Sequence, residues 1–572
     1  MPLVRFLEED ARGAGPSGGE AKAAREVEAT VGATILEAAR LAGLAAESPC
    51  GGAGLCGKCK RRLPLEALGN VRSPENGVLT QEERAAGVVL ACETEIVGDI
   101  SVFYKADDGN EGLRILSEGA GADISLAPYV TKRYVESEGV TRVYGGDRLL
   151  LTEAGDTSGE AYGLSLDIGT TTLVMSLVDL ATGRELGAAS ALNPQAAYAQ
   201  DVLSRIKLAS EPAGLAKLRS VFLEEANRMA GELSERHGVR RDRVYEAVYS
   251  GNTCMLHLAA GASPEPLGRY PYTPALNGGE SYGAADQGLD ISPGGLIYMP
   301  PIISAYVGAD ITSGILATEL LDRAGVTLFV DIGTNGEMAL NANGRVYAAS
   351  TAAGPAFEGM NISCGMRAGA GAIERVEISD GEVRLGVIGG GAAKGLCGSG
   401  LIDAAGEMAA RGIVEKSGRF AAPEATGFPD RFTKEGGKTA FALAEGVAVS
   451  QNDLRQIQLA KGAIRAGIES LLRQVGIPPE AVGRTLIAGS FGYHLRPESL
   501  FNIGLLPRAL AGGVEFVGNT SGAGGKAFLL DWRRREEMKG RVKEIEALEL
   551  ANLPDFDRLF ISCLNFQDEP AL

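Results

Sequence analysis

The 572-residue sequence has no apolar run that approaches the roughly 20 residues needed by a membrane-spanning helix. Its first residues, MPLVRFLEED, contain neither a basic segment followed by an apolar core nor a myristoylation glycine. We therefore expect a cytoplasmic protein without a membrane partner. Basic residues are also in the minority, because 55 Lys and Arg stand against 73 Asp and Glu, for a net charge of −18. Such a charge repels a phosphate backbone, so nucleic acid is not an expected partner.

Histidine is scarce, and cysteine is sparse over most of the chain. His237, His257 and His494 share no ligand spacing, which argues against a histidine-based metal site and against a Ser/His/Asp triad. Eight cysteines are too few for a disulfide scaffold in a chain of this length. Four of them lie between residues 50 and 92, and in a reducing compartment such clustering indicates a metal site. The remaining four are scattered and are expected to be small buried residues: Cys254, Cys364, Cys397 and Cys563.

The clustered cysteines have the spacing C-x5-C-x2-C-x32-C, formed by Cys50, Cys56, Cys59 and Cys92. Plant-type ferredoxins hold an iron-sulfur cluster with C-x4-C-x2-C and a distant fourth cysteine, so the first gap here is one residue longer. Glycines between these cysteines allow a loop to wrap closely and to direct amide groups at cluster sulfurs. A zinc site or four unrelated thiols is the alternative, but structural zinc favours two paired C-x2-4-C knuckles and only one pair is present.

The segment before the cysteines predicts a strand, a turn and a helix that begins with Thr34 and Glu37 in capping-box spacing. Ile35, Ala38, Ala39 and Ala42 then belong to the buried face of that helix. The order strand, helix, cysteine loop resembles the 2Fe-2S ferredoxin domain over residues 1–103, and the longer first gap is familiar from its adrenodoxin-like branch. This resemblance implies a β-grasp fold with a 2Fe-2S cluster held by the four cysteines.

Two further segments share one pattern: LSLDIGTTTLVMSLVDLATGRELGAAS, from Leu164, and LFVDIGTNGEMALNANGRVYAAS, from Leu328. Each predicts a strand, a D-I-G-T loop, a second strand, a turn and a third strand. In such a loop, glycine lets backbone amides approach phosphate oxygens, threonine hydroxyls donate to them, and aspartate holds Mg²⁺ or orients water. A single D-I-G-T could be an ordinary turn, but two copies with matching hairpins indicate a phosphate and Mg²⁺ clamp.

The duplication resembles the acetate and sugar kinase, Hsc70 and actin superfamily (ASKHA), in which two ribonuclease-H-like lobes close on ATP. The resemblance implies two phosphate motifs, made of Asp167, Gly169, Thr170, Thr171 and Thr172 and of Asp331, Gly333, Thr334, Asn335 and Gly336. A buried strand followed by a loop is similar to the superfamily's adenosine loop, with Gly489, Ser490, Phe491 and Gly492. The string GLCGSGLIDA, with Gly398 and Ser399, is a further expected turn on the nucleotide side.

Four other features have structural interpretations. GNTSGAGGKA lacks the first glycine and the final Ser/Thr of a Walker A loop, so the GGK near Lys526 predicts a helix-entry turn. WRRREEMKGR interleaves basic residues with glutamates and predicts a solvated helix. Apolar residues at helical spacing from Asn452 to Leu472 predict a core helix. Glu337 is interpreted either as an aid to Mg²⁺ placement or as an exposed strand carboxylate.

A ferredoxin segment and an ATP clamp in one chain resemble the reductive activators of corrinoid proteins over nearly the whole sequence. Strings such as CGGAGLCGKC, DIGTTT, NPQAAYAQDVLSRI, YSGNTCMLHL, YVGADI, TAAGPAFEGMNISCGMRAGAGAI and SQNDLRQIQLAKGAI carry the resemblance. It implies a multidomain α/β protein with a 2Fe-2S ferredoxin-type domain at 1–103, a linker and small middle module at 104–160, and a two-lobed ASKHA ATPase domain at 161–572. The middle segment is short for the family, which leaves its role in partner docking open.

The resemblance also implies an ATP-hydrolysing enzyme that returns an oxidised Co(II) corrinoid protein to Co(I) with an electron from an upstream low-potential reductant. Asp167 would hold hydrated Mg²⁺, Thr170 to Thr172 would contact the terminal phosphates, and Asp331 would orient or deprotonate the attacking water. A plant-type cluster lies near about −400 mV and cobalamin couples usually lie lower, so nucleotide would have to drive the transfer. A homodimer is a further expectation, because related activators are often dimeric.

Three alternative functions stay open. The chain would donate electrons to another low-potential enzyme, phosphorylate a small molecule under the control of a redox-sensing ferredoxin domain, or act as a nucleotide-gated binding module. Electron donors of the first kind generally share a 4Fe-4S cluster between protomers, which disfavours that function. The kinase predicts phosphoryl transfer to an added acceptor, and the binding module predicts ATP binding without turnover.

Overall fold

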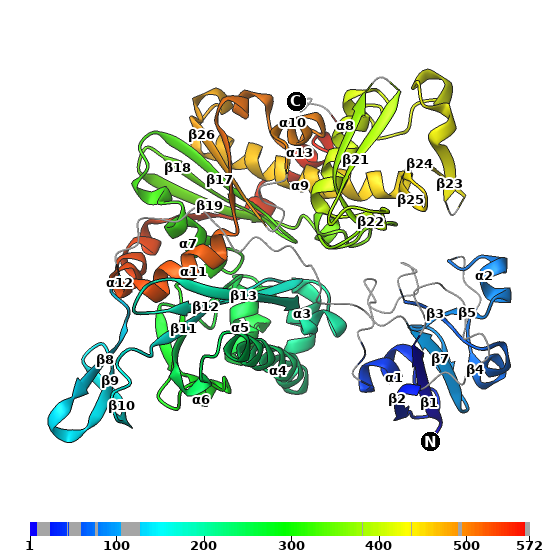
Figure 1. Cartoon of the computed structure of the whole chain (residues 1–572). Coiled ribbons are helices and arrows are strands. Elements are labelled where there is room, and N and C mark those ends of the chain that lie inside the picture. Colours follow the sequence, from blue (N-terminus) through cyan, green and yellow to red (C-terminus); the bar gives the residue numbers. More distant parts are fainter. Residues whose placement is uncertain are drawn as a thin grey trace. The chain divides into compact units, whose positions relative to one another are not determined.

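The computed structural model describes residues 1–8, 23–42, 44, 59–74, 78–104, 126–379, 381–435, 437–489 and 495–566. The chain forms two compact units, shown in Figure 1. One comprises Met1–Gly112 with Ala197–Gln200, and the other comprises Leu113–Ala196 with Asp201–Leu572. No helix in the described ranges is long and apolar enough to cross a membrane.

The first unit contains a mixed five-stranded sheet with the order β2-β1-β7-β3-β5. Its strands are β1 (Leu3–Glu8), β2 (Ala23–Glu28), β3 (Lys60–Arg62), β5 (Val88–Leu90) and β7 (Ile100–Tyr104). Helix α1 (Ile35–Leu41) begins at the predicted capping box, because the Thr34 amide donates to Glu37 at 2.7 Å and the Glu37 amide donates to the Thr34 hydroxyl at 3.2 Å. Ile35, Ala38 and Ala39 are buried as predicted, whereas Ala42 follows the end of the helix and is only partly buried.

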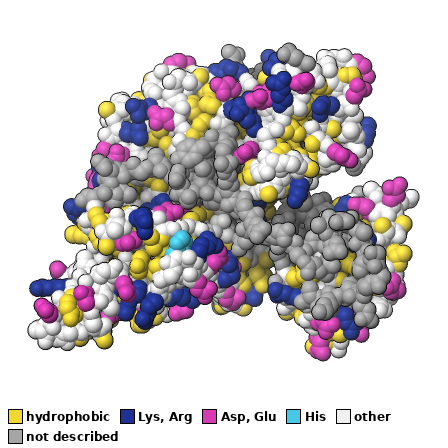
Figure 2. Space-filling model, in the orientation of Figure 1, with side chains coloured by type: hydrophobic (Ala, Val, Ile, Leu, Met, Phe, Trp, Pro, Cys, Tyr) yellow, Lys and Arg dark blue, Asp and Glu magenta, His cyan; other side chains and the backbone are white. Residues whose placement is uncertain are grey.

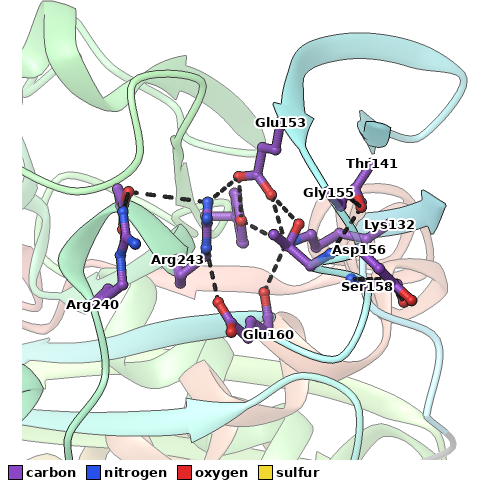
Figure 3. Close-up of polar contacts among 12 residues, drawn as sticks. Lys132, Thr141, Glu153, Gly155, Asp156, Ser158, Glu160, Arg240 and Arg243 are labelled. Carbon is purple, nitrogen blue, oxygen red and sulfur yellow. Dashed lines mark hydrogen bonds and ion pairs between the residues drawn. The ribbon is translucent and has the colours of Figure 1, made fainter. Parts of the chain in front are cut away.

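The second unit begins with a small antiparallel sheet of β8 (Val130–Val135), β9 (Val140–Gly145) and β10 (Arg148–Ala154). Ion pairs attach it to Arg243, the residue directly before β14 (Val244–Gly251) (Figure 3). Lys132 Nζ lies 2.9 Å from the Glu153 carboxylate, and Arg243 Nη1 lies 2.6 Å from the same group. Burial alone would raise the pKa of Glu153, but hydrogen bonds from Thr157, Tyr245 and Lys132 lower it. The paired charges therefore fix the sheet at one end of this unit (Figure 1).

The first lobe of the second unit is a six-stranded sheet with the order β13-β12-β11-β14-β16-β15. These strands are β11 (Tyr162–Ile168), β12 (Thr172–Asp179), β13 (Glu185–Leu192), β14 (Val244–Gly251), β15 (Glu280–Gly283) and β16 (Leu296–Met299). One face packs on helix α4 (Pro212–Arg236) through Leu218, Phe222 and Met229. The shorter helices of this lobe are α3 (Val202–Ala209), α5 (Thr253–Ala260), α6 (Ala284–Gln287) and α7 (Ala309–Ala317).

The second lobe repeats this architecture in a sheet with the order β27-β26-β17-β18-β19-β28. Its strands are β17 (Val326–Ile332), β18 (Gly336–Ala342), β19 (Arg345–Thr351), β26 (Arg484–Ala488), β27 (Val514–Gly518) and β28 (Glu546–Leu548). Asn343 and Gly344 both have positive φ, of 55° and 94°, as a two-residue hairpin turn requires. The duplicated hairpins β11–β13 and β17–β19 are therefore confirmed.

Helix α9 (Gln451–Val475) covers one face of the second sheet and confirms the predicted core helix. The remaining helices of this lobe are α8 (Gly398–Ala410), α10 (Pro497–Asn502), α12 (Trp532–Arg541) and α13 (Phe556–Ser562). Small sheets β20–β22 (Ala372–Ser379, Glu382–Val387, Gly395–Leu396) and β23–β25 (Phe432–Glu435, Lys438–Ala444, Val447–Ser450) flank it.

Helix α11 (Thr520–Leu530) packs against α7 between the two sheets (Figure 1). A Cβ atom on Gly524 would lie 2.0 Å from the Ser313 carbonyl oxygen, so only glycine allows this approach. The prediction of a helix-entry turn near Lys526 is wrong, because Lys526 lies inside α11 and pairs with Glu185 at 2.6 Å. The glycines serve the contact between helices rather than the start of one.

We expect Gly524→Ala to lower the free energy of unfolding of this unit by roughly 1–3 kcal/mol, the usual cost of overpacking a tight contact. The matched control is Gly522→Ala on the same helix, where the added Cβ meets only the Asn519 side chain at 3.4 Å. Alanine has the higher helix propensity, so this control should not lose stability. Chemical denaturation measures both variants, and equal stability of the two would contradict the close contact.

The helix predicted to be solvated, α12, is largely polar but contains one buried cation. Arg535 donates to the two oxygens of Glu246 at 2.6 and 2.9 Å and lies 4.5 Å from the centre of the Tyr298 ring. The prediction of a solvated helix is therefore wrong for Arg535, which is buried against Glu246. The sequence did not indicate this pair because the two residues are far apart in the chain. Elsewhere on the face shown in Figure 2, basic side chains are interspersed with acidic ones.

Candidate functional site

The first phosphate loop connects β11 to β12 and is fixed by side chains from three other segments. Asn193 Nδ2 donates to the Gly169 carbonyl at 2.8 Å, and Asn252 Nδ2 donates to the Thr170 hydroxyl at 3.1 Å. Arg205 Nη2 donates to the Thr170 carbonyl at 2.6 Å. Burial lowers the pKa of Arg205 to about 10, although it stays charged at neutral pH. These three residues lie in strings that carried the family resemblance, but their roles were not predicted.

The second phosphate loop connects β17 to β18 and meets the first. The Gly333 amide donates to the Asn335 carbonyl at 3.0 Å, which closes the turn. A Cβ on Gly336 would lie 2.7 Å from the Ile464 side chain, so α9 covers this loop closely. The hydroxyl oxygens of Thr171 and Thr334 lie 3.1 Å apart. The structure thus brings the two predicted phosphate loops together from separate lobes.

Five acidic side chains gather around these loops: Asp167, Asp310, Asp331, Glu337 and Glu358. Burial and the charges of Asp310, Asp167 and Glu358 raise the pKa of Asp331 to about 8. Burial and the Asp167 charge raise the pKa of Asp310 to about 7. The pKa of Glu337 is also raised, chiefly by burial. Mutual repulsion of this kind favours a bound divalent cation.

Asp167 receives two hydrogen bonds from a segment that the sequence did not connect with it. Asn519 Nδ2 donates to one carboxylate oxygen at 2.9 Å, and the Ser521 hydroxyl donates to the other at 2.7 Å. Burial nevertheless raises the pKa of Asp167 above its usual value. The residues Asn519 and Ser521 belong to the string rejected as a Walker A loop, and they position the first aspartate from the start of α11.

Glu337 is 6% exposed, so the interpretation as an exposed strand carboxylate is wrong. Its neighbours on β18 pack into the core, and its Oε1 atom has no hydrogen-bond partner among the described residues. Within these residues no three metal-binding side chains converge closely enough to ligate one ion directly. That arrangement fits Mg²⁺, which usually binds through one or two carboxylates, several waters and substrate phosphates.

The raised carboxyl pKa values predict a pH dependence in protein free of nucleotide and divalent cations. The folded-state pKa values of Asp310 and Asp331, about 7 and about 8, lie above the unfolded value of about 4. The folded state therefore keeps protons that the unfolded state has already released, so the free energy of unfolding falls as the pH rises from about 4 to the folded-state pKa values of about 7 and about 8. Relative to wild type, Asp331→Asn should gain stability from pH 6 to 8 by up to about 1.4 kcal/mol per pH unit.

Thermal or chemical unfolding in the presence of a chelator measures that difference. Comparing the two proteins at each pH cancels the contribution of groups that titrate identically in both. Lys461 is such a group, because burial lowers its pKa to about 7. A stability gap that stays constant over this range would contradict the burial of a protonated Asp331.

The two further nucleotide segments are described in part. Gly489 directly follows β26, and its amide donates to the Gly518 carbonyl at 3.2 Å, while Ser490, Phe491 and Gly492 lie outside the described residues. Gly398 and Ser399 are buried in the first turn of α8, where the sequence suggested a turn. A Cβ on the next residue, Gly400, would lie 2.0 Å from the Ile373 carbonyl, so the helix packs closely on β20.

Two of the four predicted cluster ligands lie within the described residues. Cys59 precedes β3 and Cys92 follows β5, and pairing of these two strands brings their sulfur atoms to 3.2 Å. Both side chains are buried. Cys50 and Cys56 lie outside the described residues. A pair of thiols held together on one side of the sheet fits a shared inorganic centre.

Fold and site together define a class of protein: a ferredoxin-type unit with paired thiols, joined to a two-lobed ASKHA-type unit whose duplicated loops meet beside carboxylates. Protein-family models match three parts of the chain. Residues 20–97 match a 2Fe-2S iron-sulfur cluster binding domain, residues 162–323 match the RACo middle region, and residues 325–571 match the C-terminal ASKHA domain of RACo.

The chain is 30% identical to the corrinoid activation enzyme RamQ of Eubacterium limosum, over 92% of this chain and 95% of that protein. It is also 30% identical to the Co(II) methylated amine-specific corrinoid protein reductase of Methanosarcina barkeri, over 47% of this chain and 51% of that protein. A solved structure of a reductive activator for corrinoid, iron-sulfur protein is 32% identical, with a TM-score of 0.73 and coverage of 99% of this chain and 98% of that one. This chain therefore belongs to the family of corrinoid reductive activators, and the predicted family and fold class are confirmed.

Proposed function

We propose that this protein is an ATP-dependent reductive activator that delivers one low-potential electron to the Co(II) centre of an inactive corrinoid protein and restores Co(I). The observation that carries the proposal is the meeting of Thr171 and Thr334 beside carboxylates, in a chain that also holds paired thiols. The relatives named for corrinoid activation and corrinoid protein reduction support it. The electron would enter from an upstream low-potential reductant.

The inorganic groups would be held by the residues predicted from sequence. Cys50, Cys56, Cys59 and Cys92 would hold a 2Fe-2S cluster, which supplies a one-electron carrier when bound. Asp167 would hold Mg²⁺ through its water shell, with Asn519 and Ser521 fixing the carboxylate. A bound Mg²⁺ neutralises phosphate charge.

The nucleotide-binding role belongs to the two loops. Hydroxyl and amide groups of Thr170, Thr171 and Thr172 would donate to the terminal phosphates from one lobe, and Gly333, Thr334, Asn335 and Gly336 would do so from the other. Asp331 would hold the attacking water and accept its proton, a role that suits a carboxylate with a pKa of about 8. Gly489 to Gly492 would line the adenosine, with Gly398 and Ser399 nearby on the nucleotide side.

Because the loops come from separate lobes, a phosphate group that contacts both would favour one arrangement of the lobes over another. Only such differential binding lets a nucleotide drive an uphill electron transfer, since equal binding to both arrangements shifts nothing. We propose that lobe closure on ATP favours docking of the Co(II) protein and that hydrolysis releases it.

Glu358 lies between the two loops, in contact with the threonines that we assign to the terminal phosphates. Its carboxylate accepts a hydrogen bond from the Thr334 hydroxyl at 2.5 Å, and hydrogen bonds from Thr171 and Thr334 counteract the rise in its pKa caused by burial. Gly354 and Gly359, both at a φ of 79°, flank the short turn that carries it. We propose that Glu358 holds the loops in the nucleotide-free protein and is displaced by ATP.

We expect Glu358→Ala to bind ATP more tightly than wild type, by about threefold to tenfold. The physical reason is that the variant loses two charge-assisted hydrogen bonds that ATP must otherwise break. Glu358→Gln keeps an acceptor without the charge and should give an intermediate affinity, while Glu382→Gln on the exposed β20–β21 hairpin should have no effect. Equilibrium titration with a non-hydrolysable ATP analogue measures all three. Weaker binding by Glu358→Ala would show that this residue binds nucleotide instead of competing with it.

The proposed function is tested by mixing the anaerobically reconstituted protein with a chemical reductant, Mg-ATP and candidate Co(II) corrinoid proteins. The expected result is the Co(I) absorption band with ATP and its absence without nucleotide. Equal reduction without ATP would contradict the proposal, as would a reconstituted protein that retains no iron or sulfide. Added small-molecule acceptors should not become phosphorylated, which separates this function from a kinase.

A further inference from the structure

A cavity of about 350 Å³ lies between the two lobes of the second unit. Tyr272, Ser304 and Tyr306 line it from the first lobe, and Ser350, Glu549 and Asn552 line it from the second. None of its described lining residues carries a positive charge. None of them belongs to the loops or carboxylates described above. The cavity is therefore separate from the phosphate loops, and its lining residues indicate which class of ligand it binds.

One wall is aromatic and rigid. The rings of Tyr272 and Tyr306 have centroids 5.4 Å apart and an interplanar angle of 60°, and Tyr270 packs edge-on against Tyr272 at 6.0 Å. The Tyr306 hydroxyl donates to the Leu267 carbonyl at 3.1 Å, which fixes that ring. Tyr272 has a φ of 56°, a strained conformation for a bulky residue. Strain of this kind is retained mainly where a side chain must be held in a particular place.

The lining also includes a negative charge. Glu549 lines the cavity from the second lobe, and Asn552 Nδ2 donates to one of its carboxylate oxygens. The Glu549 charge contributes to the raised pKa of Tyr306, after burial and the neighbouring Tyr272, which places the carboxylate within electrostatic range of the ring. An anionic ligand would be repelled here. Aromatic faces and a carboxylate are instead the combination that attracts organic cations.

Three polar side chains that line the cavity, Ser304, Tyr306 and Glu549, already have hydrogen-bond partners, which restricts the ligand further. The Ser304 hydroxyl oxygen accepts from the amides of Tyr306 and Val307 at 3.3 and 3.2 Å. The Tyr306 hydroxyl is bound to Leu267, and Glu549 is bound by Asn552. A sugar or another ligand with many hydroxyl groups would lose hydrogen bonds to water that these walls do not fully replace. A quaternary ammonium ion has no N–H group to satisfy.

We propose that this cavity binds a small methylated ammonium cation, with Tyr272 and Tyr306 facing its methyl groups and Glu549 balancing its charge. The site would use cation–π attraction in a partly desolvated volume, where it is stronger than at an open surface. Because both lobes line the cavity, the ion would contact both at once. The proposal requires neither ATP nor the iron-sulfur cluster, so it can be tested independently of the reductive activity.

Isothermal titration of the full-length protein with tetramethylammonium chloride tests the proposal, with tert-butyl alcohol as the neutral analogue of similar shape. Saturable binding of the cation and none of the alcohol is expected. Tyr306→Leu and Glu549→Gln should each weaken binding about 3- to 30-fold. Tyr306→Phe keeps the aromatic ring and therefore the cation–π attraction. Its dissociation constant for the cation should stay within about threefold of the wild-type value. Glu546→Gln, an exposed carboxylate on β28 outside the cavity, is the matched charge control.

The competing source of a cation is a lysine or arginine side chain on a protein partner. It is distinguished by titration with n-butylammonium and methylguanidinium. Tighter binding of either ion than of tetramethylammonium would overturn the proposal in favour of such a docking point. No saturable binding by correctly folded wild type, or equal binding by wild type and the Tyr306→Leu and Glu549→Gln variants, would also overturn it.

Discussion

Replacing Asp331 with asparagine is expected to slow ATP-dependent Co(II) reduction by about 100- to 10,000-fold, the range that a positioned acid–base group contributes. Asp331 lies near the end of β17, and the charges of Asp310, Asp167 and Glu358 help burial to raise its pKa to about 8. Asparagine preserves the shape of the side chain but accepts no proton. The rate of Co(I) formation at saturating Mg-ATP, with excess reductant and under anaerobic conditions, measures the effect.

Asp147→Asn is the matched control for this prediction, because Asp147 is exposed in the turn between β9 and β10. Both variants should keep the iron content and visible absorption of wild type, since the exchanged carboxylates lie outside the ferredoxin-type unit. Asp167→Asn is also expected to slow ATP-dependent Co(II) reduction. If Asp331→Asn retained full activity with an intact cluster, Asp331 would have no part in the ATP site.

The second large effect is expected from Cys92→Ser, which should abolish electron delivery to the corrinoid protein and deplete the iron and sulfide content. A 2Fe-2S cluster requires four ligands of the correct type, and serine is a poor replacement for a thiolate in a site built for sulfur. The buried Cys92 sulfur lies 3.2 Å from that of Cys59, so its loss breaks the described pair. ATP hydrolysis should persist, because the phosphate loops are unchanged.

Cys364→Ser is the control for the cysteine exchange. Its sulfur lies in the ATP-binding unit, 3.7 Å from the Gly446 carbonyl, and a serine hydroxyl can keep that contact. Iron, sulfide and activity should therefore match wild type. Full cluster content in Cys92→Ser would assign the fourth ligand to another residue, while loss of iron in both variants would point to a general folding defect.

The hairpins around the two D-I-G-T loops could be predicted because each is encoded by adjacent residues. The alternation of apolar residues determines which face of each strand is buried, and Asn343-Gly344 favours the observed turn. The capping box at Thr34 and Glu37 is equally local, since both partners lie within one helical turn. Short-range patterns of this kind do not depend on the rest of the fold.

Predictions failed where a residue's role depended on a distant partner. The glycines of α11 suggested a helix start, but Gly524 is required by the Ser313 carbonyl on α7. Glu337 was as consistent with an exposed position as with a buried one, until the sheet placed it against the core. Arg535 belonged to a charged run, and only the fold paired it with Glu246.

By itself, the sequence determined the division into a ferredoxin-type part and a two-lobed ATP-binding part, together with the cysteine spacing and the two phosphate loops. The tertiary structure decided which side chains share the site, because only the folded chain brings Asp310, Glu358, Asn519 and Ser521 near the two loops. It also created the tyrosine-lined cavity, because residues of both lobes line it. The physical reason is that local backbone preferences act over a few residues, whereas shared burial and charge act between segments more than 300 residues apart.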